Sequence, residues 1–165
     1  MFMAKKKKPC IEAAMYMLGR RDYSIKEMRG KLALKEYSQE EIDETVARLE
    51  DLEYLDDKKY ARHFVSDKGR LSGWGRMRIE LSLRQKKIPE EDIQAAIEVY
   101  EEKMEKNDVP TWTARATELL ERRYGFFEGS LETADFQKRM NFLLRRGYNM
   151  DQARQALENT RRQED

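Results

Sequence analysis

The sequence has almost no cysteine or histidine: Cys10 and His63 are the only residues of their kinds. A single cysteine excludes a disulfide within the chain and a zinc site built on paired thiolates. His63 falls in an expected helix beside Phe64, which favours a packing or surface role over that of a catalytic base. Scarce cysteine is typical of a reducing compartment, so we expect a cytoplasmic protein.

Proline, glycine and long apolar runs are scarce as well. Only 3 Pro and 8 Gly interrupt 165 residues, which leaves long stretches free to form helix. No run of about 18 apolar residues exists, so we expect no membrane span. No apolar region follows the basic start of the chain, so no secretory signal is visible. Charged residues make up 39% of the chain, which predicts an elongated body with a thin core.

Opposite charges nearly cancel, at 33 Lys and Arg against 32 Asp and Glu, but they come in blocks. Residues 1–35 carry ten basic and three acidic side chains, and residues 36–57 carry one and ten. The alternation returns in residues 62–87, with eight and two, and in residues 88–108, with two and eight. A pattern of basic then acidic blocks, seen twice, indicates a repeated unit.

Apolar residues recur with the same repeat. When the chain is aligned on Tyr37, Ile88 and Tyr148, an apolar residue stands five positions before, five after and nine after each of them. These matched sets are Leu32, Leu83 and Leu143; Ile42, Ile93 and Ala153; and Val46, Ile97 and Leu157. Each copy is typical of three helices, and capping-box spacing marks several helix starts. The three boxes are Ser24 with Glu27, Ser38 with Glu41, and Asn149 with Gln152.

We therefore predict an all-α fold of three tandem three-helix repeats, about nine helices, in an elongated curved array. The boundaries that we expect are a basic N-terminal tail at 1–9 and repeats at 10–55, 56–108 and 109–165. No segment alternates with a period of two residues, so we predict no sheet.

The middle helix of the second repeat has two apolar faces. Ile79 and Leu83 form one face, and Met77 and Leu81 form the other. A helix that is apolar on two sides predicts packing between neighbours on both.

The sequence offers no catalytic, cofactor or metal site. No Gly-Lys-Ser or Gly-Lys-Thr occurs, so there is no P-loop, and we expect no ATP hydrolysis by the chain alone. Gly73-Trp74-Gly75 begins like a dinucleotide fingerprint, but position 78 is Arg78 instead of the third glycine. This segment is better interpreted as a tight connection between helices. Acidic clusters such as Glu40-Glu41 are typical of helix N-termini, where the helix dipole favours them.

Basic residues gather in the second repeat and form our candidate binding site. A basic patch with an aromatic residue among its members can hold a phosphate backbone and stack a base, or it can meet an acidic protein surface. The alternative is a solvated face with one half-buried tryptophan. The residues are Arg70, Trp74, Arg76, Arg78, Arg84, Lys86 and Lys87. We expect weak, salt-dependent DNA binding, because acidic blocks oppose this patch.

Three segments together resemble the RecX family of regulatory proteins. The first is the run from Arg20 to Leu32, the second the run from Tyr54 to Val65, and the third the run from Gly73 to Ile88. Arg145-Arg146-Gly147-Tyr148 agrees with the third repeat, so the resemblance covers nearly the whole chain.

The resemblance implies a curved array of three-helix repeats in a cytoplasmic bacterial protein that binds the RecA recombinase filament on DNA. It implies a non-catalytic regulator that suppresses the ATPase, strand-exchange and coprotease activities of RecA, with roles in recombination, DNA repair and the SOS response. Some family members also bind DNA. We expect a monomer. Two alternatives are a helical-repeat nucleic-acid-binding module that acts without RecA and a plain helical scaffold.

The chain departs from the family pattern where a glycine often precedes the aromatic or aliphatic residue after a helix. Glu36, Glu53 and Lys87 stand at those positions. Either these helix ends close differently, or a residue with a side chain adopts the left-handed conformation at a cost of about 1 kcal/mol.

Overall fold

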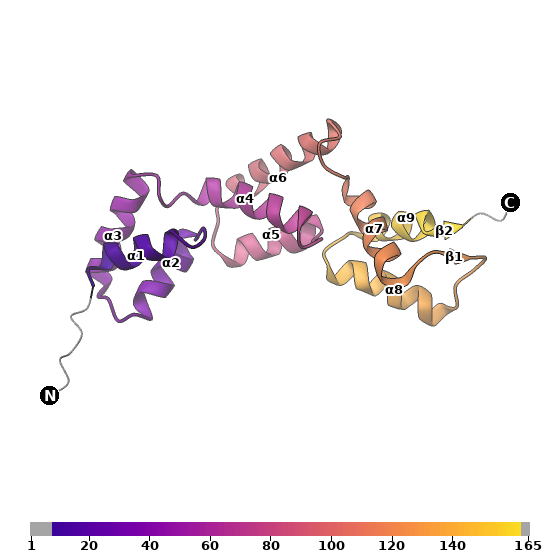
Figure 1. Cartoon of the computed structure of the whole chain (residues 1–165), viewed down its shortest axis with the longest axis horizontal. Coiled ribbons are helices and arrows are strands. Elements are labelled where there is room, and N and C mark those ends of the chain that lie inside the picture. The colour runs from indigo at the N-terminus through magenta and orange to yellow at the C-terminus, as the bar shows by residue number, and fades with distance from the viewer. Residues whose placement is uncertain (1–7, 163–165) are drawn as a thin grey trace.

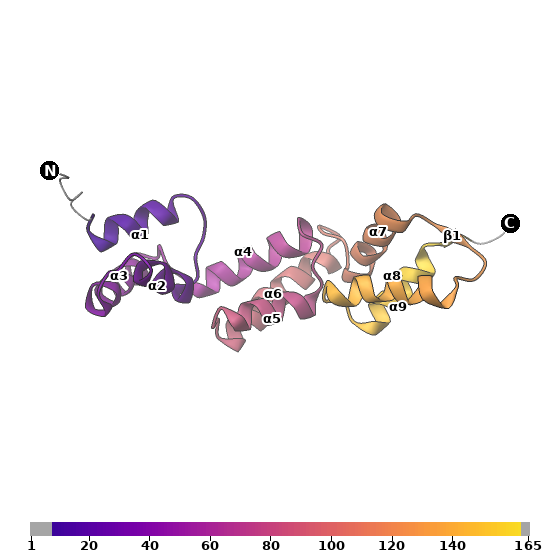
Figure 2. The same cartoon turned by 90° about the horizontal axis from the view of Figure 1, so that it is seen from below.

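The structure is a computed structural model that describes residues 8–162. Within that range 69% of the residues are helical, and nine helices form three successive triplets (Figures 1 and 2). The triplets follow one another along an elongated, curved body, which confirms the predicted all-α fold. The bounds are α1 (Cys10–Leu18), α2 (Ile25–Ala33), α3 (Gln39–Asp51), α4 (Asp57–Arg70), α5 (Arg76–Gln85), α6 (Glu90–Glu105), α7 (Trp112–Tyr124), α8 (Thr133–Arg145) and α9 (Met150–Asn159). Most of the predicted N-terminal tail lies outside the described residues, as does most of its lysine run.

Side-chain caps fix where several helices begin, as the sequence predicted. Ser24, Ser38 and Asn149 each accept a hydrogen bond from the backbone N–H three residues later, and that later side chain accepts one in return. The Asp56 carboxylate caps α4 by accepting a hydrogen bond from the Lys59 N–H at 3.0 Å. These bonds satisfy N–H groups that the first helical turn leaves without a partner.

Helix ends close in the left-handed conformation even where glycine is missing. The φ angles are 63° at Glu36, 58° at Glu53 and 62° at Lys87, matching 91° at Gly147 in the third repeat. After each of α2, α5 and α8, the N–H of the residue beyond the left-handed position donates to a carbonyl in the last helical turn, as in a Schellman motif. The second of our two alternatives is therefore confirmed: three charged residues hold a conformation that glycine adopts at less cost.

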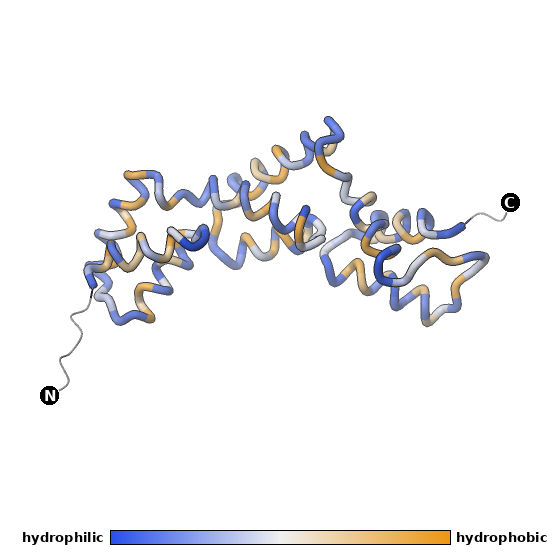
Figure 3. The backbone as a smooth tube through the Cα atoms, in the orientation of Figure 1, coloured by the Kyte–Doolittle hydropathy of each residue, from blue (hydrophilic) through white to orange (hydrophobic). Residues whose placement is uncertain are grey.

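The hydrophobic core is divided unequally. One cluster lies wholly in the first repeat, around Met28, Leu32 and Leu49. A second, larger cluster runs through the second and third repeats together, from Tyr60 to Leu157. Apolar stretches are distributed through all three repeats, with polar stretches between them (Figure 3). The predicted boundary between the second and third repeats thus crosses a continuous core, and the boundaries themselves stay a prediction.

The prediction of no sheet was wrong in one small place. Strands β1 (Phe127–Glu128) and β2 (Arg161–Arg162) pair in parallel, two residues each. The chain leaves α7 at Gly125, with a φ of 71°, and runs beside the end of α9, where the Phe127 N–H donates to the Thr160 carbonyl at 3.1 Å. Two residues are too few to show an alternating pattern, so this pairing left no signal in the sequence.

The second apolar face of α5 is not packed as predicted. Ile79 and Leu83 are fully buried, but Met77 is 58% exposed and Leu81 55% exposed. Helix α5 contacts α4 and α6, and Ile79 and Leu83 belong to the core that these helices share. The periodicity placed both apolar faces of α5 correctly, but only the face with Ile79 and Leu83 is buried.

Candidate partner-binding surface

The Gly73-Trp74-Gly75 segment locks the second repeat to the third. The Gly75 N–H donates to the Arg146 carbonyl at 2.8 Å, and the Met77 N–H donates to the Gly147 carbonyl at 3.0 Å. A Cβ atom on Gly75 would lie 2.4 Å from the Gly147 carbonyl group, so only glycine allows this approach. The interpretation as a tight connection is correct, and the second partner in the connection is the third repeat.

Trp74 lies at the centre of a cluster of aromatic and cationic side chains. Its ring meets Phe64 edge to face, with centroids 6.1 Å apart. The Arg78 guanidinium lies 4.1 Å from the centroid of the Trp74 ring, and the Lys68 ammonium lies 4.9 Å from it. Cations held over aromatic faces keep their polar edges available to an outside anion. The structure thus brings together Trp74 and Arg78, and adds Lys68, which our sequence interpretation missed.

Arg76 and Arg84 lie on the opposite flank of α5 and are already ion-paired. Arg76 contacts Glu80 at 2.8 Å and Glu101 at 3.0 Å, and Arg84 contacts Glu90 at 2.7 Å. The hydrogen bond from Arg84 is the main cause that lowers the pKa of Glu90 to about 2. Glu80 stands four positions from each arginine on the same helix, a spacing that could have revealed these pairs. An outside anion would therefore compete with glutamates for this flank.

Of the remaining three predicted residues, Lys86 borders the aromatic cluster around Trp74, 5.7 Å from the centroid of the Phe64 ring, and the other two lie apart from it. Lys86 forms an ion pair with Glu27 of the first repeat at 2.5 Å and lies 5.8 Å from the centroid of the Tyr60 ring. Lys87 is exposed in the turn after α5. Arg70 is exposed at the end of α4, and its backbone carbonyl accepts a hydrogen bond from Arg115 at 2.5 Å. Among residues 8–162, neither Arg70 nor Lys87 has a carboxylate within 4.0 Å.

The third repeat holds a second set of cations on aromatic rings that sequence analysis did not single out. Tyr124 and Phe142 lie edge to face, with centroids 5.7 Å apart. Four cations rest within 6 Å of these rings: Arg123, Lys138, Arg139 and Arg146. The spacing of Lys138, Phe142 and Arg146, four residues apart on one helix face, was the available signal.

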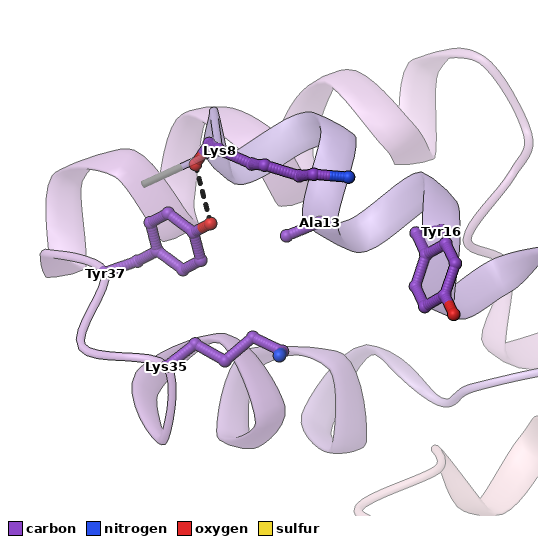
Figure 4. A pocket seen from close by; sticks show the side chains of 5 residues that line it. All are labelled: Lys8, Ala13, Tyr16, Lys35 and Tyr37. Carbon is purple, nitrogen blue, oxygen red and sulfur yellow. Dashed lines mark hydrogen bonds between the residues drawn. The ribbon is translucent and has the colours of Figure 1, made fainter. Parts of the chain in front are cut away.

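One hollow lies in the first repeat. Its volume is about 450 Å³, and it is lined by Lys8, Ala13, Tyr16, Lys35 and Tyr37 (Figure 4). The Tyr37 hydroxyl donates to the Lys8 carbonyl at 2.7 Å. This lining contains no nucleophile beside a base. In the part of the chain that the structure describes, no three side chains gather that could ligate a metal, and no helix is long and apolar enough to span a membrane.

Three similar helix triplets in tandem, bearing clustered cations on aromatic rings, define an all-α repeat protein with surfaces suited to binding. Family models described as the first, second and third three-helix domains of RecX match residues 10–49, 56–97 and 113–157. The chain therefore belongs to the RecX family of regulatory proteins.

Known RecX proteins align with this chain over nearly their full length. Regulatory protein RecX of Trichlorobacter lovleyi is 33% identical over 90% of this chain and 94% of its own length. Regulatory protein RecX of Chlorobium phaeobacteroides is 29% identical over 92% of this chain and 93% of its own. The crystal structure of RecX from Lactobacillus salivarius superposes with a TM-score of 0.70 at 23% identity, covering 92% of this chain and 94% of the other. That likeness confirms the fold.

Proposed function

We propose that this chain binds the RecA filament on DNA and lowers its ATPase, strand-exchange and coprotease activities. Through these effects it would regulate recombination, DNA repair and the SOS response. The observation that carries the proposal is the match of all three repeats, in order, to the three domains of the RecX family. We further propose that the protein acts in the cytoplasm, as a monomer, and contacts DNA weakly or through the filament.

An elongated body suits a partner that repeats along an axis. The three triplets extend in one direction, so different repeats can contact successive RecA protomers (Figure 2). Contacts that bridge protomers favour the one protomer geometry that they fit, and they oppose the change of geometry that turnover needs. Inhibition then needs no catalytic group in the regulator.

The contact surface that we propose centres on Trp74 and Arg78, with Lys68 beside them. Both cations lie over the Trp74 ring, and neither has a carboxylate within 4.0 Å among residues 8–162. We retain the other predicted residues as candidates: Arg70, Arg76, Arg84, Lys86 and Lys87. Arg76 and Arg84 would have to exchange glutamate partners for those of RecA, which reduces their net contribution.

The decisive experiment is the single-stranded-DNA-dependent ATPase rate of RecA with increasing amounts of this protein. The rate should fall, and the protein alone should hydrolyse no ATP. Reversing Lys68 and Arg78 to Glu should weaken inhibition tenfold or more, since each close charge contact at an interface can contribute about 1.5 kcal/mol. Reversing the exposed Arg48 and Arg154 is the control with the same change in net charge.

Two results would contradict the proposal. One is unchanged RecA turnover at saturating protein with binding confirmed, and the other is equal loss of inhibition in both double variants. For Arg76 and Arg84 the informative change is to Gln, because a glutamate there would face Glu80, Glu90 and Glu101.

A nucleic-acid-binding module that acts without RecA is the second candidate. The stacking of Lys68 and Arg78 on Trp74 favours it, because such surfaces also hold single strands. Sequestration of DNA would lower RecA turnover only while DNA is limiting. Inhibition that persists when DNA is in large excess over both proteins separates the two functions.

A further inference from the structure

Arg139 is a buried arginine without a counter-charge. Its residue is only 8% exposed, on α8, and no carboxylate among residues 8–162 lies within 4.0 Å of it. The guanidinium lies 5.1 Å from the Tyr124 ring centroid and 5.3 Å from that of Phe127, and it donates to the Gly125 carbonyl at 3.3 Å. Its buried Nε has no hydrogen-bond partner among the described residues. Burying an unpaired charge is costly, so this arrangement needs a reason beyond packing.

Three more cations surround the same aromatic pair. Arg123 lies 4.9 Å from the Phe142 centroid, Arg146 lies 4.9 Å from it, and Lys138 lies 5.7 Å from the Tyr124 centroid. Their hydrogen bonds in the described part of the chain go to neutral oxygens: Arg123 donates to the Tyr124 hydroxyl at 3.2 Å and Arg146 to the Ser72 carbonyl at 2.9 Å. We call Arg123, Lys138, Arg139 and Arg146 the third-repeat cation cluster.

One flank of the second repeat shows the opposite arrangement, in which each arginine is ion-paired. Arg76 and Arg84 have two glutamate partners each. The chain carries 32 acidic residues, yet none of the described ones pairs with the third-repeat cation cluster. Asp135, one turn before Arg139 on the same helix, is exposed and forms no ion pair with it. Four neighbouring cations without an acid create a local positive potential that an external anion can neutralise.

We propose that the third-repeat cation cluster binds a phosphate group, carried by a nucleotide or by a nucleic-acid strand. Guanidinium groups held beside aromatic rings present N–H groups that match the geometry of phosphate oxygens. Arg139 would contribute its uncompensated charge from its buried position, while Arg123 and Lys138 supply exposed charge at the rim. This site lies in a different repeat from the surface in our proposed function, and it requires no RecA.

The first test measures binding of a 20-nucleotide oligothymidylate by fluorescence anisotropy at several salt concentrations. Each phosphate contact on a single strand contributes a slope of about −0.7 in log K against log salt, or about fivefold in affinity at 0.1 M. Replacing Arg123 and Lys138 by Gln should therefore weaken binding about 25-fold and lower the slope by about 1.4. Replacing the exposed Arg48 and Arg154 by Gln removes the same charge and should leave the slope unchanged.

The second test isolates the buried arginine. Arg139→Met keeps the length and packing of the side chain and removes its charge. Binding should weaken about fivefold, while the thermal midpoint should stay the same or rise, because an uncompensated buried charge is gone. A lower midpoint with unchanged affinity would show that Arg139 is structural. Equal losses of affinity in the Arg123 and Lys138 variant and in its control would overturn the whole site.

The third test identifies the source of the phosphate by competition against the labelled oligonucleotide. Displacement by millimolar ADP, lost in the Arg123 and Lys138 variant, assigns the site to a nucleotide. Retention of the oligonucleotide assigns it to a strand. Displacement by polyglutamate as efficient as by unlabelled oligonucleotide would assign the cluster to an acidic protein and refute the phosphate proposal. RecA is absent from all three tests, so their failure leaves the proposed function standing.

Discussion

The two junctions between repeats are built from different interactions. Between the second and third repeats the core is continuous, and Tyr148, 1% exposed, donates its hydroxyl to the Gly73 carbonyl at 3.2 Å. Backbone groups from both repeats interlock around Gly75 and Gly147. Between the first and second repeats, the buried residues within 8–162 fall into two separate clusters. The junction of the second and third repeats is held by a shared core and a close backbone approach, and the junction of the first and second by polar contacts.

Polar contacts cross the junction of the first and second repeats. They include Ile25 N–H to the Asp57 carboxylate at 2.9 Å, the Lys26 ammonium to the Gln85 carbonyl at 2.8 Å, Lys86 to Glu27 at 2.5 Å, and His63 to Asp22 at 2.7 Å. Exposed or partly exposed pairs of this kind contribute little each and weaken with salt. The chain therefore consists of a rigid pair of repeats and a first repeat docked on it less firmly.

The largest expected effect comes from making a cavity in one of the two hydrophobic cores at a time. Leu32→Ala in the first core should cost about 2–5 kcal/mol and raise hydrogen exchange in α1 to α3 alone, since Leu32 contacts only that core. Leu83→Ala should raise exchange across α4 to α9 together. Loss of protection in all nine helices after Leu32→Ala would show that the two cores unfold as one.

The next largest loss of stability is expected at the close approach of Gly75 to Gly147. Gly75→Ala places a methyl group 2.4 Å from the Gly147 carbonyl, where only backbone can yield, and should cost about 3 kcal/mol in urea unfolding. Gly30→Ala is the matched control, because a Cβ there meets nothing within 4 Å. In the middle of α2 that change should stabilise by about 0.5–1 kcal/mol. Similar destabilisation by both changes would contradict the importance of the close approach.

A smaller effect is expected at the polar junction. Lys86→Met removes the ion pair to Glu27 and should weaken the docking of the first repeat on the second by about 1 kcal/mol. The distance distribution between spin labels at positions 44 and 98 should then become broader. Arg29→Met, which breaks an exposed pair with Asp43 inside the first repeat, should leave that distribution unchanged. The labels would be introduced in a Cys10→Ala background.

The same junction should respond to acid. Burial raises the pKa of Glu27, but hydrogen bonds from Lys86 and the Ser24 N–H outweigh it, so the pKa lies below its ordinary 4.5. A carboxylate with a lowered pKa stabilises the folded state above its unfolded pKa, and this contribution disappears as pH falls through the folded pKa. The label distance should therefore broaden below about pH 4 in the parent protein. The Lys86→Met variant should show a smaller change over that range.

The smallest effect concerns the left-handed helix ends. Lys87→Gly relieves a φ of 62° and should raise stability by about 0.5 kcal/mol after the extra unfolded-state entropy of glycine is counted. Asn107→Gly, at a φ of 59°, should gain less, because asparagine tolerates this conformation. Equal gains at both sites would show that side-chain type does not determine the strain.

Local features were predictable from the sequence, and contacts between distant segments were not. The three capping boxes depend on residues within one turn, and the repeat register depends on comparison between repeats. The left-handed conformation at Glu36, Glu53 and Lys87 was one of two outcomes expected from the resemblance to the RecX family. The pairing of Arg76 with Glu101 and the burial of Arg139 depend on how separate helices meet. Single-sequence periodicity gives the direction of a side chain on its own helix but not which neighbour covers it, as Met77 and Leu81 demonstrate.

The short connection between the two parts of the molecule has a consequence for avidity. Helix α3 ends at Asp51 and α4 begins at Asp57, so five residues tether the first repeat to the rigid pair. A tether of that length keeps one part near the other at millimolar effective concentration even when the polar contacts open. On a partner with a repeating surface, release of one part would then be followed by rebinding more often than by escape. Residence time would exceed what either part achieves alone.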